Sequence, residues 1–240
     1  MQMGALHKTP GTIKALIYIN AAIYVVYLVL LAAGINITTL FGVVPYLALT
    51  KYHVWQFVTY MFMHGSVFHL LFNMLMLWML GTELYIVWGR SFFIKYYFIC
   101  GIGAGLAVVL LSFLNPSSFM VPTIGSSGAI FGLLLAYGLI FKNRVLYVFG
   151  LIPVKALKLV VIMGAIELVS LFSQENSSIS HLAHLGGLIT GFVYLRIKTW
   201  QRKITAKRYQ KWEQKDHGHD NVIRVDFEKD KDTPNNKTWN

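Results

Sequence analysis

Six long apolar segments run through the 240-residue chain and limit what it can fold into. A helix needs about 20 apolar residues to cross the hydrocarbon core of a bilayer, and each segment is close to that length. Only 13% of the residues are charged, whereas a soluble domain has about 25%. We therefore expect an all-α membrane protein built as a bundle of six transmembrane helices. The predicted spans are Ile13–Ala33, Val67–Val87, Phe92–Leu114, Thr123–Phe141, Leu157–Phe172 and Ile179–Ile197.

The basic residues are distributed unevenly between the connections that join these spans. The formal net charge is +11, and the positive side chains gather after the second, fourth and sixth spans, while the opposite connections hold only Lys51. This is the positive-inside pattern of a membrane protein, so it indicates contact with a bilayer and no binding of nucleic acid. It predicts a multi-pass protein of the cell membrane with both termini in the cytoplasm.

The same pattern divides the chain into three parts. Residues 1–12 form a cytoplasmic N-terminal segment, residues 13–198 form the six-helix membrane domain, and residues 199–240 form a charged, poorly ordered cytoplasmic tail. The first outer connection, from Asn36 to Ser66, is rich in aromatic residues. Aromatic side chains favour the membrane interface, so we expect this loop to be re-entrant or interfacial.

Four polar side chains from three predicted spans fall at one depth. Ser127 follows the start of the fourth span, His184 follows the start of the sixth, and His69 and Asn73 lie in the first two turns of the second. All three spans enter from outside, which places these side chains roughly 5–10 Å below the outer surface at about 1.5 Å of rise per residue. Polar groups are costly in hydrocarbon and usually mark a functional site.

Small residues predict how two of these spans pack. Gly128, Gly132 and Ala136 are spaced four apart on the fourth span, and Ala183, Gly187 and Gly191 are spaced four apart on the sixth. Such stripes allow helix backbones to approach closely. If the stripes face each other, the serine and the histidine come within reach of one another.

A serine hydroxyl is a weak nucleophile that needs a nearby base, and His184 is the best candidate for that base. Attack on a peptide carbonyl creates an oxyanion, which the Asn73 amide, the Ser127 backbone N–H and His69 are placed to stabilise. Since no aspartate lies near either motif, we expect a Ser–His dyad and not a triad. Phe131 lies one turn deeper than Ser127 and either stacks on His184 or packs as an ordinary apolar residue.

Three motifs together resemble those of the rhomboid intramembrane serine proteases. They are Gly-x-Ser-Gly at 125–128, Ala-His-x-x-Gly at 183–187 and His-x-x-x-Asn at 69–73. The resemblance implies Ser127 as nucleophile, His184 as general base, and His69 and Asn73 in the oxyanion hole. It gives Phe131 the position that packs on the base and gives Gly125, Gly128 and Gly187 supporting roles. Many relatives carry a Trp-Arg pair in the first outer loop, and this chain has none between residues 36 and 66.

The expected function is therefore endopeptidase cleavage of transmembrane segments near their outer ends, with an active site close to the extracellular side. The alternative is a non-catalytic rhomboid-like factor that binds membrane proteins. A solute transporter would show inverted repeats with broken helices, which are absent from the sequence, and a zinc peptidase would show His-Glu-x-x-His. We expect no cofactor and no metal. Glu167 lies within the fifth span, where it is either a protonated, hydrogen-bonded carboxyl group or a support for the site.

Overall fold

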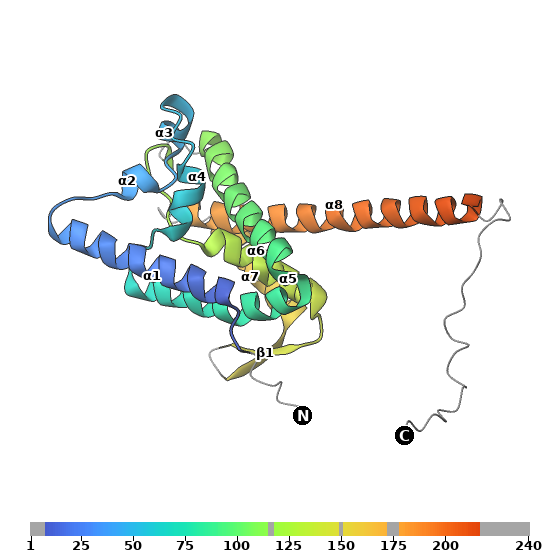
Figure 1. The fold of residues 1–240 in the computed structure, drawn as a ribbon. Helices are drawn as coiled ribbons and strands as arrows, with labels where there is room; N and C mark the ends of the chain where they lie inside the picture. Colours follow the sequence, from blue (N-terminus) through green and yellow to red (C-terminus); the bar gives the residue numbers. More distant parts are fainter. Residues whose placement is uncertain (1–7, 115–117, 149–150, 172–177, 217–240) are drawn as a thin grey trace, which may run out of the picture. The chain divides into compact units, whose positions relative to one another are not determined.

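The structure is a computed structural model that describes residues 8–114, 118–148, 151–171 and 178–216 (Figure 1). Two units divide the chain, residues 1–196 and residues 197–240. The described part consists of eight α-helices, two short 3-10 helices and two strands. In chain order the elements are α1 (Gly11–Ala32), α2 (Thr38–Phe41), α3 (Pro45–Thr50), α4 (Gln56–Thr59), η1 (Tyr60–Phe62), α5 (Val67–Leu111), η2 (Ser112–Leu114), α6 (Ser127–Ile140), β1 (Val145–Val148), β2 (Ile152–Lys155), α7 (Ala156–Ser170) and α8 (Ser178–Asp216).

Helix α5 contains the second and third predicted spans. Its 45 residues are interrupted at Gly89, whose φ of 75° and ψ of 167° are not helical. A positive φ suits glycine because it has no Cβ, so the chain turns there and a second helix follows. Residues 67–88 and 90–111 are thus two helices joined at a kink.

The helices correspond to the predicted segments, but they differ in length. Among the described residues, α1 and α5 are long and apolar enough to cross a membrane, and α6 is apolar but has only 14 residues. The protein is a membrane protein with helical spans, and its domain is mostly helical. Helices α6 and α7, with 14 and 15 residues, are shorter than a full span.

Helix α1 shows how an apolar helix distributes its two faces. Its buried residues follow helical spacing and are Ile13, Leu16, Asn20, Tyr24 and Tyr27. The opposite face exposes aliphatic side chains, with Val25 59% and Val29 65% accessible. A helix that is apolar on both faces requires an apolar surrounding on the face that the protein does not cover, which a bilayer supplies. Figure 1 shows α1 beside the first half of α5, and these two helices are in contact.

Helix α6 is the most deeply packed helix of the first unit, in contact with both α5 and α7. Ten of its fourteen residues are buried. Two buried tyrosines tie neighbouring segments together: Tyr60 donates a hydrogen bond to the Gly101 carbonyl at 2.6 Å, and Tyr96 donates one to the Gly132 carbonyl at 2.8 Å. The second bond joins α5 to α6 below the candidate site.

Gln56 lies at the centre of the loop between α1 and α5. Gln56 is fully buried; its Oε1 accepts a hydrogen bond from the Val44 backbone N–H at 3.1 Å, and its Nε2 donates to the Thr39 carbonyl at 2.8 Å. Trp55 donates from Nε1 to the Leu40 carbonyl at 2.9 Å. The loop therefore has fixed internal structure, with α2, α3, α4 and η1 folded on each other.

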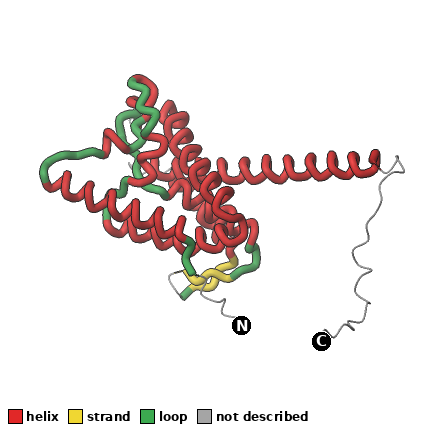
Figure 2. Tube along the Cα trace, viewed as in Figure 1, coloured by secondary structure: helices red, strands yellow, loops and turns green. Residues whose placement is uncertain are grey.

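Two sequence-based expectations about the fold need correction. The domain is not purely α-helical, because β1 and β2 pair antiparallel between α6 and α7, with Val145 opposite Lys155 (Figure 2). Exposed and half-buried residues alternate along β1, as is typical of a strand. From the sequence we expected only a basic connection between two spans here. The described part of the tail, residues 199–216, is helical where we expected little order, since α8 continues to Asp216. Residues 217–240 lie outside the described part of the chain.

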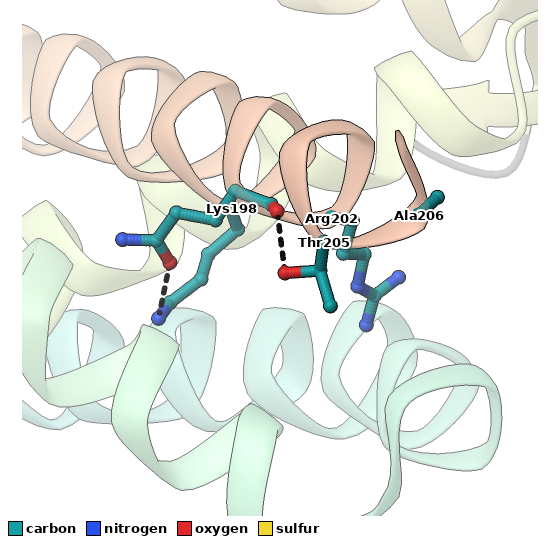
Figure 3. A pocket seen from close by; sticks show the side chains of 5 residues that line it. Lys198, Arg202, Thr205 and Ala206 are labelled. Atoms are coloured by element: carbon teal, nitrogen blue, oxygen red, sulfur yellow. Dashed lines mark hydrogen bonds between the residues drawn. The ribbon is translucent and has the colours of Figure 1, made fainter. Parts of the chain in front are cut away.

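The second unit begins within α8, where the helix becomes polar. Figure 3 shows a shallow hollow on this part of the helix, in which Lys198 Nζ donates to Gln201 Oε1 at 3.1 Å and Thr205 Oγ1 donates to the Gln201 carbonyl at 3.0 Å. Its lining is completed by Arg202 and Ala206. The hollow contains none of the residues that the sequence motifs single out.

Candidate active site

Ser127 and His184 lie in direct contact. His184 Nε2 is 2.8 Å from Ser127 Oγ, although 57 residues separate them along the chain. Ser127 is the first residue of α6, and His184 lies in the second turn of α8. Both residues are partly accessible, and the hydroxyl lies within hydrogen-bond distance of the imidazole. The distance is that of a hydrogen bond between a nucleophile and its base.

The small-residue stripes explain how the two helices come so close. A Cβ built on Gly187 would lie 1.9 Å from the Gly128 carbonyl oxygen, and a Cβ on Gly128 would lie 3.2 Å from the Ala183 carbonyl oxygen. The backbones of α6 and α8 are therefore in contact along the predicted stripes. This confirms the expected packing, and it brings the start of α6 next to the second turn of α8.

Phe131 stacks on the histidine. The two rings are nearly parallel, at 11°, with their centroids 4.2 Å apart. The stacking alternative is thus confirmed over ordinary packing. Because Phe131 is itself buried, the imidazole lies against a fixed surface that restricts rotation of its ring.

Gly125 brings a third helix to the site. Its φ of 116° lies in the region that glycine favours, and its backbone N–H donates to the Tyr60 carbonyl at 2.8 Å. A Cβ at this position would lie 2.7 Å from His69 Nε2 and 3.8 Å from Ser127 Oγ. The imidazole of His69 and the serine hydroxyl therefore both lie close to the position that a side chain at residue 125 would occupy. Ser126 is fully buried, and of the two adjacent serines it is Ser127 whose hydroxyl contacts the histidine.

Asn73 lies one turn after His69 on α5. It is 3% exposed, and its Nδ2 donates to the His69 carbonyl at 2.9 Å. An amide nitrogen carries two hydrogens, so this bond uses one and orients the group. His64 is fully buried, and its ring centroid lies 5.0 Å from that of His69. Burial, with His69 as the second cause, lowers the pKa of His64 to about 4.

The structure adds an acidic residue that the sequence motifs do not contain. Glu167 Oε1 lies 2.9 Å from His184 Nδ1, on the ring nitrogen opposite to the one facing Ser127. Glu167 Oε2 lies 2.5 Å from His181 Nδ1. The sequence-based expectation was a Ser–His dyad, because no aspartate lies near either motif; the structure places the carboxyl group of Glu167, a glutamate from another helix, in contact with His184. The available signal was a carboxylate inside an apolar segment, a position where polar groups usually have a function.

Comparison with known proteins shows which family the chain belongs to. The family model described as "Rhomboid domain" matches residues 51–201, which include every residue of the candidate site. The chain is 30% identical over 139 residues to "Rhomboid protease GluP" of Bacillus subtilis (strain 168), a match that covers 58% of this chain and 25% of that protein.

Two further relatives show the same similarity. The chain is 27% identical over 207 residues to "Rhomboid protease GlpG" of Salmonella paratyphi A, covering 82% of this chain and 67% of that protein. It is 30% identical over 134 residues to "Rhomboid protein 1, mitochondrial" of Saccharomyces cerevisiae, covering 55% of this chain and 38% of that protein. The matches thus span well under half of the length of some relatives. Because the family model matches more than half of the chain, this protein belongs to the rhomboid family.

Proposed function

We propose that this protein is an intramembrane serine endopeptidase that cleaves transmembrane segments of other membrane proteins. The observation that carries the proposal is the 2.8 Å contact between Ser127 Oγ and His184 Nε2 across two packed helices. The stacking of Phe131 on the same imidazole supports it.

The reaction follows from this geometry. Neutral His184 accepts the hydroxyl proton at Nε2 as Ser127 Oγ attacks the peptide carbonyl carbon, and a tetrahedral intermediate forms. The imidazolium then returns the proton to the leaving amine nitrogen, and the peptide C–N bond breaks. Water attacks the resulting acyl ester by the same route, with His184 again as the base, and restores the free serine.

The oxyanion of the intermediate needs donors that are already in position. Ser127 begins α6, and the first backbone N–H groups of a helix have no partners within the helix. His69 Nε2, beside Gly125, and the second hydrogen of the Asn73 amide add donors from α5. Each such donor contributes about 3 kcal/mol to transition-state stabilisation in serine proteases.

The charge distribution supports an orientation with six spans and both termini in the cytoplasm, which puts the site toward the extracellular side of the cell membrane. Peptide bonds of a transmembrane helix are held in hydrogen bonds from residue i to residue i−4, and the helix must unwind before attack. We therefore expect substrates with glycine, proline or other helix-weakening residues near their outer ends. A Leu-rich, strongly helical substrate that is cleaved equally fast would contradict this.

A serine-directed fluorophosphonate probe tests the proposal. We expect the probe to label the purified wild-type protein at Ser127, and labelling to be lost in Ser127→Ala and strongly slowed in His184→Ala. Ser126→Ala serves as the matched control and should label normally, because Ser126 is fully buried and the hydroxyl that contacts the base belongs to Ser127. Equal labelling of wild type and Ser127→Ala would remove Ser127 as the nucleophile. Absence of labelling in all variants would favour the non-catalytic, membrane-protein-binding alternative.

A further inference from the structure

The carboxyl group of Glu167 joins two histidines on the side of the site away from the serine. One oxygen lies 2.5 Å from His181 Nδ1 and the other 2.9 Å from His184 Nδ1. The Glu167 side chain is 7% exposed, and the two imidazoles are 21% and 18% exposed. Glu167 comes from α7 and both histidines from α8, so the carboxyl group connects two helices beside the base.

The two contacts differ in kind. The bond with His181 is a short hydrogen bond, in which a carboxylate oxygen accepts from a protonated Nδ1. The contact with His184 has the distance of an ion pair without the alignment of a hydrogen bond. His181 therefore fixes where the carboxyl group lies, and the carboxyl group acts on His184 mainly through its charge.

That charge decides which nitrogen of His184 carries the proton. A neutral imidazole has one protonated and one unprotonated nitrogen. A carboxylate 2.9 Å from Nδ1 favours a proton there, because the alternative would place two lone pairs against each other. Nε2 is then the unprotonated nitrogen, the form required to accept the proton of Ser127. The carboxylate also stabilises the positive ring that forms when the proton arrives.

We propose that Glu167, held by His181, is the positioning residue that sets the tautomer of His184 and stabilises its charged form. This inference rests on the proposed protease function and deepens it: the acidic member of the catalytic group comes from α7 and lies outside all three sequence motifs. Neither Glu167 nor His181 touches Ser127 in the described structure, so both act through His184.

The same three side chains allow a second interpretation. One ligand atom from each of Glu167, His181 and His184 lies within 4.8 Å of the others, a cluster that could hold a divalent cation. The distances favour the direct interaction. Metal–ligand bonds of about 2.0–2.2 Å hold neighbouring ligand atoms more than about 3 Å apart, whereas the carboxylate lies at 2.5 and 2.9 Å from the two nitrogens. A cation bound to Nδ1 would also force the proton onto Nε2 and disable the base.

Glu167→Gln tests the proposal because it preserves size and removes charge. The glutamine amide can accept from Nδ1–H or donate to a bare Nδ1, so both tautomers become populated. We expect kcat for cleavage of a transmembrane substrate to fall about 10²-fold or more, with KM changed less than about twofold, as when a triad loses its carboxylate. Glu167→Asp, which restores the charge on a shorter side chain, should recover part of kcat. Met163→Gln, one turn earlier on α7, is the matched control for a new amide on that helix and should retain kcat.

Nitrogen-15 NMR of histidine-labelled full-length protein reports which ring nitrogen of His184 carries the proton. This tautomer would not change if Glu167 had only a structural role. The wild type should show His184 protonated at Nδ1, and Glu167→Gln should show a mixture. Unchanged kcat and an unchanged tautomer in Glu167→Gln, with wild-type labelling at Ser127 intact, would overturn this inference and leave the protease proposal standing. Loss of labelling at Ser127 in the wild type would instead overturn the protease proposal. Activity that changes when EDTA removes metal would overturn the direct interaction in favour of a cation site.

Discussion

Gly187→Ala is the substitution that most directly probes how the site is assembled. The added Cβ would lie 1.9 Å from the Gly128 carbonyl oxygen, whereas ordinary contact begins at 3.4 Å. The atom it meets belongs to the backbone of α6, so no side chain can rotate away. Helices α6 and α8 must separate by about 1.5 Å, the difference between these two distances.

The separation should act on catalysis more than on folding. Ser127 Oγ and His184 Nε2 are 2.8 Å apart, and an added shift of this size takes them beyond hydrogen-bond distance. A misplacement of 1 Å can cost about 10²-fold in rate, so we expect kcat to fall by at least that factor. Overpacking costs about 1–3 kcal/mol of stability, partly offset by the roughly 1 kcal/mol by which alanine favours a helix over glycine.

The assay compares cleavage rate and thermal melting in the same detergent. Gly164→Ala is the matched control, because its new Cβ would lie 3.6 Å from Leu188 Cδ1, an ordinary contact. It should retain the wild-type rate and melting temperature. If Gly187→Ala cleaves at the wild-type rate, the close approach of α6 and α8 does not set the geometry of the site and the reasoning fails.

Three further substitutions test other parts of the account. Gly125→Ala puts a Cβ 2.7 Å from His69 Nε2, at a residue whose φ is 116°. We expect the cleavage rate to fall more than the melting temperature does. Phe131→Leu removes the ring stacked at 4.2 Å on His184, and since an aromatic pair contributes about 0.5–1.5 kcal/mol, kcat should fall roughly threefold to tenfold. An unchanged kcat would contradict a positioning role for that ring. Gln56→Leu leaves the Val44 N–H and the Thr39 carbonyl without their partner, which costs about 1–3 kcal/mol of stability for each buried group. Limited proteolysis should then show faster cutting within residues 36–66. Unchanged cutting would argue against a structural role for Gln56.

The contact between Ser127 and His184 was predictable because its causes are local in the sequence. A polar residue beside each small-residue stripe indicated the face on which each helix packs. The spacing of four between Ser127 and Phe131 gave the stacking position in the same way. These features depend on helical periodicity alone, which a single sequence reveals.

Glu167 was not predictable as a partner of the base, because its contact depends on how α7 packs against α8. The sequence showed only that a carboxyl group lay in an apolar segment, which left a protonated group and a supporting role both open. The β1–β2 hairpin was missed for a related reason: four-residue strands carry too little periodicity to distinguish them from a loop. The helix through residues 199–216 was missed because low hydrophobicity was read as disorder, although much of this stretch consists of helix-forming lysine, arginine, glutamine and alanine.

The most direct test of the central claim is cleavage in a bilayer. The purified full-length protein is reconstituted into liposomes with a single-span substrate that carries glycine near its outer end, and the products are identified by mass spectrometry. We predict one cut near the outer end of the substrate helix by the wild type and none by Ser127→Ala or His184→Ala. Equal cleavage by Ser127→Ala, or binding of the substrate by the wild type without any cut, would contradict the account.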